Sequence, residues 1–305
     1  MAVALIYDPI FLEHDTGESH PENANRLRSI LHHIEPIKDQ LLWLTPQRAT
    51  YDLIANVHSE EQIETVEFSS QLSHAIDADT QTSAASYEAA LKAAGAGITA
   101  VDALLDKRIS SAFSVIRPPG HHASATRSMG FCLFNNIAIT ARYAQEMGFE
   151  KILIVDFDVH HGNGTQDIFY NDPTVFYFST HQYPAYPGSG SNSECGEAEG
   201  EGFTLNFPFQ PGSGDDDVIP VYEEYLPQVI ESFQPDLLLV SAGYDLHAAD
   251  PLASLNVSTE GIAEIVSLIM ESTEVPKLFF LEGGYHLEAL GISVKRTLEV
   301  MIETV

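Results

Sequence analysis

The sequence predicts an α/β protein with a central parallel sheet covered by helices on both faces. Short apolar runs alternate along the chain with longer segments of helical periodicity, as in strand–helix–strand units. The clearest run, residues 152–155, is followed directly by Asp156, which is typical of a strand buried on both faces. Because the 305 residues contain no Pro/Ser/Gly-rich linker and no repeat, we expect one domain over residues 1–305.

Six strands and four helices carry the clearest patterns. The apolar runs predict strands near Val3–Tyr7, Ala112–Val115, Lys151–Val155, Val175–Ser179, Leu237–Val240 and Leu278–Leu281. The helical patterns are clearest at Ser83–Asp106, Asn135–Met147, Asp217–Phe233 and Thr259–Glu271. Ser258 or Thr259 is a suitable N-cap for the last helix. The glycine-rich piece Pro187–Gly202 is too short to link domains, and we interpret it as an active-site loop.

Composition limits the possible partners and the cellular compartment. Forty-four acidic residues against fourteen basic ones give a formal charge of −30, which disfavours direct binding to nucleic acids and to anionic membranes. That charge could steer cationic substrates, although adaptation to salt or solubility explains it more simply. Two cysteines in unrelated contexts indicate no disulfide framework. Since no segment is long enough to span a membrane, we expect a cytoplasmic location, and no pattern indicates an oligomeric state.

Acids and histidines follow two of the buried strands. Because side chains alternate along a strand, Asp158 and His160 are expected to point in the same direction, and Asp156 to share it one step deeper. Asp245 follows the strand at Leu237–Val240. Two carboxylates and one imidazole would leave open positions on a divalent cation, as a catalytic site requires. The simpler alternative is that these side chains only cap the turns after the strands.

A second histidine motif strengthens the catalytic interpretation. His121 and His122 stand side by side after a Pro-Pro-Gly turn that can continue neither a helix nor a central strand. Amide hydrolysis needs one imidazole to take a proton from water and another group to deliver one to the leaving amine. Paired imidazoles beside a cation are suited to that task.

These motifs together resemble a known family. RPPGHHA, DFDVHHGNGT, SAGYD and LEGGY, in this order, closely resemble the histone deacetylases, including bacterial deacetylase-like and acetylpolyamine amidohydrolases. HPEN, followed by Arg26, is similar to the family's N-terminal signature. The resemblance implies the arginase–deacetylase fold and metal-dependent removal of acetyl or other short acyl groups from lysine side chains or similar N-acyl amines. In place of the second acid of the D-x-H-x-D motif of the arginases stands Gly162, which favours one metal ion over two.

The resemblance also implies a role for each group in the site. Asp158, His160 and Asp245 would hold Zn2+, with Fe2+ chemically plausible. His122 would act as general base and acid, with Asp156 behind His121 and Asn163 behind His122. Tyr285 would donate a hydrogen bond to the developing oxyanion. The competing interpretation of Tyr285 is a buried core residue.

Substrate-binding positions follow from the same resemblance. The implied tunnel residues are Gly130, Phe131, Tyr186 and Leu252, with Arg26 from the N-terminal signature and Asp79 at the rim, where Asp77 is the competing choice. Polyamine-specialised relatives carry Glu at the position of Leu252, and only twelve residues separate Pro9 from Glu22, too few for their long insertion. We therefore expect an acetylated lysine peptide or protein, or another N-acyl amine, as substrate. The alternatives are an acetylpolyamine amidohydrolase and a non-catalytic acyl-ligand-binding or scaffold protein.

Two potassium sites are implied by resemblance alone. The first would use main-chain carbonyls near Asp156, Asp158 and His160, together with Ser179 and Thr180. The second would involve Phe169, Asp172 and Val175.

Overall fold

The computed structural model describes residues 2–305. Eight strands in this part of the chain form one sheet. The strand order is β2-β1-β3-β8-β7-β4-β5-β6, and every neighbouring pair is parallel. The strands are β1 (Ala2–Ile6), β2 (Leu42–Leu44), β3 (Ile109–Ser114), β4 (Ile152–Asp156), β5 (Val175–Gln182), β6 (Thr204–Phe209), β7 (Leu237–Ala242) and β8 (Lys277–Leu281). The predicted parallel sheet is therefore confirmed.

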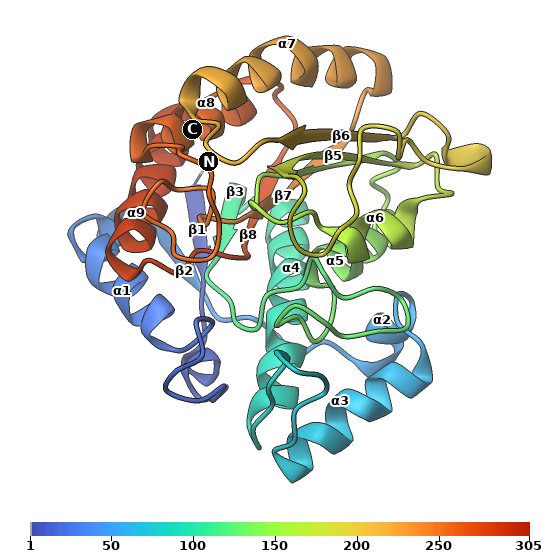
Figure 1. The fold of residues 1–305 in the computed structure, drawn as a ribbon, viewed down its shortest axis with the longest axis vertical. Helices are drawn as coiled ribbons and strands as arrows, with labels where there is room; N and C mark the ends of the chain where they lie inside the picture. Colours follow the sequence, from blue (N-terminus) through green and yellow to red (C-terminus); the bar gives the residue numbers. More distant parts are fainter. Residues whose placement is uncertain (1) are drawn as a thin grey trace.

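Helices cover both faces of this sheet (Figure 1). One layer contains α1, α9, α8 and α7, each packed against the next, and the other is built around α4 and α5. The helices are α1 (Asn25–Ile34), α2 (Tyr51–Ala55), α3 (Glu60–Leu72), α4 (Ser86–Leu105), α5 (Asn136–Glu146), α6 (Asn163–Phe169), α7 (Asp215–Phe233), α8 (Thr259–Glu271) and α9 (Leu287–Thr304), with short 3-10 helices η1 (Pro9–Leu12), η2 (Glu35–Gln40) and η3 (Ala198–Gly200). Among residues 2–305, no helix combines the length and apolarity needed to cross a bilayer.

The central strands form where the sequence has continuous apolar runs. Every residue of β4, β7 and β8 is buried, as expected for parallel strands covered on both faces. The predicted helix at Thr259–Glu271 has the bounds of α8, and the Ser258 hydroxyl accepts a hydrogen bond from the Gly261 amide at 2.9 Å. The edge strands β2 and β6 are additional to the six predicted strands.

The strand order determines where the functional segments meet. β3, β8, β7 and β4 are adjacent in the middle of the sheet, although β4 and β8 are far apart in sequence. Because all strands are parallel, their carboxyl ends lie at one edge. The segments that follow these four strands are thereby brought together.

His58 makes the stability of this framework pH-dependent. Burial lowers the pKa of His58 to about 4 and outweighs the contact of Nδ1 with the Ser124 carbonyl at 2.9 Å, which raises it. In the folded protein Nε2 accepts the Asn135 amide at 2.8 Å, so the ring is held in its neutral form. The folded pKa lies below the unfolded value of about 6.5. The unfolded state therefore gains the proton first, and stability is lost as the pH falls from about 6.5 to about 4.

We expect the loss from His58 to reach on the order of 3 kcal/mol at pH 4. Urea unfolding between pH 7 and pH 4 measures it. His58→Gln should lower stability at pH 7 and flatten the pH dependence, whereas the same change at the exposed His74 should do neither. An unchanged pH slope in His58→Gln would contradict the prediction.

Candidate active site

The segments after the four central strands carry the candidate functional side chains. Each side chain lies two to eight residues beyond a strand end, so the rigid sheet places the segment that carries it. β3 is followed by His121 and His122 (the His pair), β4 by Asp158 and His160, β7 by Asp245, and β8 by Tyr285.

Asp158, His160 and Asp245 converge on one point and form a group that could hold a metal ion, called the ligand trio below. Their ligand atoms all lie within 4.8 Å of one another. The Nδ1 atom of His160 is 3.2 Å from Oδ1 of Asp158 and 3.1 Å from Oδ2 of Asp245. Two buried carboxylates facing one imidazole suit a divalent cation that keeps open positions for water and substrate.

The loop after β4, and not the strand itself, produces this convergence. β4 ends at Asp156, so the prediction that Asp158 and His160 alternate along a strand is wrong. Asp156 Oδ1 accepts the Asp158 amide at 3.1 Å, and Asp158 Oδ1 accepts the His160 amide at 2.8 Å. The acids thus cap the turn, as the simpler alternative proposed, and in doing so they bring the trio together.

Two glycines let the carboxylates of the trio approach the backbone. A Cβ atom on Gly243 would lie 2.1 Å from Oδ2 of Asp158, and one on Gly283 would lie 2.0 Å from Oδ2 of Asp245. The Gly283 amide donates to Oδ2 of Asp158 at 2.7 Å. Any larger residue at these positions must displace a ligand oxygen.

The charges within the trio favour a cation. Burial opposes protonation of His160, but the neighbouring Asp158 and Asp245 outweigh it and raise the pKa to about 10. Burial also opposes ionisation of Asp158, yet His121 and His160 together hold its pKa below the usual range. A metal ion would therefore replace a proton between the two carboxylates.

The His pair is oriented by two different partners. His121 Nδ1 lies 3.0 Å from Asp156 Oδ2, and His122 Nδ1 lies 2.9 Å from Asn163 Oδ1. Burial disfavours the charged form of His121, but Asp156 and Asp158 outweigh it and raise its pKa to about 10. Burial and the neighbouring His121 and His160 lower the pKa of His122 well below its ordinary value. His122 is thus neutral at pH 7 and able to accept a proton.

A narrow cavity of about 190 Å³ leads to the trio. Its walls are largely aromatic: the Phe131 and Tyr285 rings are 5.9 Å apart, and the His122 and Tyr186 rings are 5.2 Å apart. A Cβ atom on Gly130 would lie 2.6 Å from the His122 ring, so a side chain at this position would collide with His122. The lining residues are Asp79, His122, Gly130, Phe131, His160, Tyr186, Leu252 and Tyr285.

Of the two rim candidates, Asp79 lines the cavity and Asp77 supports it. Oδ1 of Asp77 accepts the Asp79 amide at 3.2 Å and the Thr80 amide at 2.8 Å. His20 adds a contact that the sequence motif did not assign: its Nε2 lies 2.9 Å from the Asp79 carbonyl, and its ring packs 4.7 Å from Phe131. The rim therefore includes part of the HPEN segment.

Comparison with known proteins connects this geometry to a family. The histone deacetylase domain family matches residues 20–301. The chain belongs to the histone deacetylase family. A probable deacetylase of Archaeoglobus fulgidus is 39% identical over 94% of this chain and 82% of its own, and one of Methanothermobacter thermautotrophicus is 43% identical over 95% and 88%. Histone deacetylase 14, chloroplastic, of Arabidopsis thaliana is 40% identical over 93% of this chain and 73% of its own.

A solved structure shows the same fold. The crystal structure of the HDA15 HD domain aligns with a TM-score of 0.96 at 34% identity, covering 99% of this chain and 89% of that chain. The predicted deacetylase fold is thereby confirmed. Members of this family are generally metal-dependent, in agreement with the ligand trio.

Arg26 does not lie where the family signature led us to expect a substrate-binding residue. Its side chain is fully buried; Nε donates to the Gly284 carbonyl at 2.7 Å, and Nη1 to Glu22 Oε1 at 3.0 Å. The guanidinium lies 5.0 Å from the centre of the Tyr285 ring. Arg26 thus supports the turn that carries Tyr285 and is not among the residues that line the aromatic cavity.

The residues of the two implied potassium sites lie near β4 and β5. Ser179 is buried, with its hydroxyl 2.9 Å from His181 Nδ1, and the Thr180 hydroxyl lies 2.6 Å from that of Tyr222. In the second group, the Asp172 amide donates to the Phe169 carbonyl at 2.9 Å, and the Val175 amide to the Asp172 carbonyl at 3.4 Å. Oδ2 of Asp172 pairs with Arg142 at 2.6 Å, so that carboxylate is engaged by a side chain.

Glu282 is a functional candidate that sequence reasoning missed. Its buried carboxylate accepts the amides of Gly120 at 2.7 Å and His121 at 3.2 Å through Oε2, which fixes the backbone of the His pair. The available signal was an acid directly after an apolar strand, the same pattern that drew attention to Asp156.

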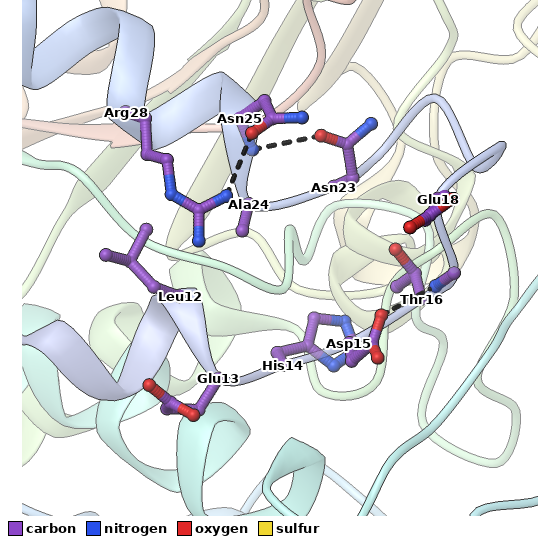
Figure 2. Close-up of a pocket in the computed structure, with 11 residues that line it drawn as sticks. Leu12, Glu13, His14, Asp15, Thr16, Glu18, Asn23, Ala24, Asn25 and Arg28 are labelled. Carbon is purple, nitrogen blue, oxygen red and sulfur yellow. Dashed lines mark hydrogen bonds between the residues drawn. The ribbon is translucent and has the colours of Figure 1, made fainter.

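A larger hollow lies away from the ligand trio (Figure 2). It encloses about 530 Å³ between the turn after η1 and the start of α1. Figure 2 shows Arg28 on one side, bonded to Asn25 at 2.8 Å, and Glu13, Asp15 and Glu18 around the rest of the hollow. It contains neither the trio nor the His pair, so the smaller aromatic cavity is the candidate active site.

Proposed function

We propose that this protein hydrolyses N-acyl amides, with acetyl-lysine side chains as substrate and a divalent cation held by Asp158, His160 and Asp245. Zn2+ is the first choice and Fe2+ the alternative. The observation that carries the proposal is the meeting of the ligand trio, a neutral His122 and Tyr285 at the end of one aromatic cavity. When bound, the cation would polarise the acyl carbonyl and make a water molecule more acidic.

His122 moves the protons in this proposal. With Nδ1–H donating to Asn163 Oδ1, its Nε2 carries the lone pair, accepts a proton from water and later delivers it to the leaving amine. His122 lines the cavity, whereas His121 does not and is held in its charged form by Asp156 and Asp158. His121 therefore contributes positive charge, Asp156 orients the His121 ring, and His122 is the base.

Tyr285 stabilises the charge that develops on the acyl oxygen. Burial raises the pKa of its phenol well above the ordinary value, so the hydroxyl keeps its proton and can donate it in a hydrogen bond. A donor already in place costs no reorganisation during the reaction.

The cavity walls support acetyl-lysine over acetylpolyamines. Phe131 and Tyr186 can enclose an apolar methylene chain, Gly130 allows close approach of its backbone, and Asp79 can accept backbone amides of a peptide. Leu252, 44% exposed at the mouth, supplies no attraction for a second ammonium.

We also propose a structural K+ next to β4, because no hydrogen bond among residues 2–305 ends on the carbonyl oxygens of Asp158 or His160.

An activity panel with Zn2+ or Fe2+ loading tests this function. We expect the metal-loaded protein to hydrolyse an acetyl-lysine peptide with a kcat/KM at least about tenfold above that for N8-acetylspermidine, since an apolar Leu252 forgoes an ionic contact. A large preference for the polyamine would overturn the substrate choice. Absence of hydrolysis for every short and long N-acyl substrate would instead favour a ligand-binding protein without turnover.

A further inference from the structure

The Asp250 carboxylate holds two cavity-lining residues at once. Asp250 lies in the segment between β7 and α8, and only 8% of its surface is exposed. Its Oδ2 accepts the backbone amide of Tyr285 at 2.7 Å, and its Oδ1 accepts that of Leu252 at 2.9 Å. Tyr285 and Leu252 both line the cavity, but they belong to different segments of the chain.

We propose that Asp250 is a positioning residue that places the phenol of Tyr285 and the wall at Leu252 together, so that turnover and substrate selection both depend on this side chain. The proposal rests on the proposed function where it speaks of turnover. Its structural part, the joint placement of two backbones, stands on the hydrogen bonds alone.

Tyr285 needs such a restraint because it follows two glycines. Gly284 has φ +116°, a conformation that few other residues adopt, so the preceding backbone is intrinsically permissive. Among residues 2–305, the Tyr285 amide has Asp250 as its hydrogen-bond acceptor and no other. This bond restricts the φ angle of Tyr285, and with it the direction in which the ring leaves the backbone.

At Leu252 the bond has a local character, whereas at Tyr285 it joins distant segments. An Asp that accepts the amide two residues later is a common turn, and Pro251 between them favours it. The bond to Tyr285 spans 35 positions in sequence. An Asp that only stabilised its own turn would accept the Leu252 amide alone, whereas Asp250 also accepts that of Tyr285. Each of the two side-chain oxygens accepts one amide, Oδ1 that of Leu252 and Oδ2 that of Tyr285, so a single side chain can hold both segments.

The first test is Asp250→Asn, which keeps the shape but leaves one oxygen for two amides. We expect kcat for an acetyl-lysine peptide to fall about tenfold or more, and the preference between acetyl-lysine and N8-acetylspermidine to change at least about threefold. Asp215→Asn is the matched control, because Asp215 also uses both oxygens, for the Ser258 amide at 2.8 Å and the Ser258 hydroxyl at 2.6 Å, and does not line the cavity. Equal effects in both variants would overturn the proposal.

A double mutant separates the two consequences. In a Tyr285→Phe background there is no phenol to place, so Asp250→Asn should lower kcat by less than about threefold more. The change in substrate preference should persist, because it arises at Leu252. If Asp250→Asn lowers kcat by the same factor in both backgrounds, it does not act through Tyr285.

Amide hydrogen exchange tests the placement without any activity. The Tyr285 and Leu252 amides should be protected in the wild-type protein and exchange faster in Asp250→Asn. The Gly283 amide, which donates to Asp158 at 2.7 Å, should keep its protection, and metal content should not change. Unchanged exchange at Tyr285 and Leu252 would refute the proposal. If the wild-type protein hydrolyses no N-acyl substrate, the proposed function fails, and the exchange result still decides the role of Asp250.

Discussion

Replacing Tyr285 with Phe should lower hydrolysis of an acetyl-lysine peptide by on the order of a hundredfold or more, as losses of oxyanion donors do. The ring remains, so its packing against Phe131 at 5.9 Å and the Arg26 contact at 5.0 Å are kept. Only a hydrogen bond made mainly in the transition state is lost. The fall should therefore appear in kcat, with little change in substrate binding.

Steady-state kinetics and titration with an unreactive acyl-lysine analogue measure the two effects separately. Tyr244→Phe is the matched control, because the Tyr244 hydroxyl is bonded to Thr297 at 3.0 Å and does not line the cavity. That variant should lose stability and keep kcat. Retention of full activity by Tyr285→Phe would return Tyr285 to the role of a core residue.

Gly283→Ala should weaken divalent metal binding at least about a hundredfold and remove activity with it. The new methyl group would need the space of Asp245 Oδ2, 2.0 Å away, and of Asp158 Oδ2, 2.7 Å away. One methyl group thus displaces two of the three ligands.

Elemental analysis after dialysis, together with competition against a chelator, measures the loss of metal. Gly214→Ala is a suitable control, because the atom nearest to the new Cβ would be the Asn256 carbonyl oxygen, 3.1 Å away, and Asn256 is not part of the trio. The control should keep stoichiometric metal. A Gly283→Ala protein with wild-type metal content would show that the trio is not the metal site.

The sequence predicted the parts of the fold that depend on local pattern. β4 and β7 are continuous apolar runs, and in parallel sheets such runs are strands whose ends meet at one edge. Asp158, His160 and Asp245 could therefore be expected together, although Asp158 and His160 lie in the loop after β4 and do not alternate along the strand as predicted. The role of a loop in bringing them together depends on amide contacts with Asp156, which the pattern does not contain.

The remaining features depend on partners that are distant in sequence. β2 has three residues and β6 contains Pro208, so neither edge strand shows a clear alternation or apolar run. Glu282 and Asp250 act through the amides of Gly120 and Tyr285, which the fold alone brings near. Arg26 belongs to a family signature, yet its interactions with main-chain carbonyls could be recognised only in three dimensions.

The reacting groups and the residues at the mouth of the cavity are carried by different segments of the fold. The ligand trio, the His pair and Tyr285 follow the central strands β3, β8, β7 and β4, whereas Asp79 belongs to the connection between α3 and α4 and Tyr186 to that between β5 and the edge strand β6. Exchanging those connections between relatives should therefore retune which acylated molecule enters without rebuilding the catalytic machinery. The architecture offers protein engineers a fixed reaction centre with a replaceable entrance.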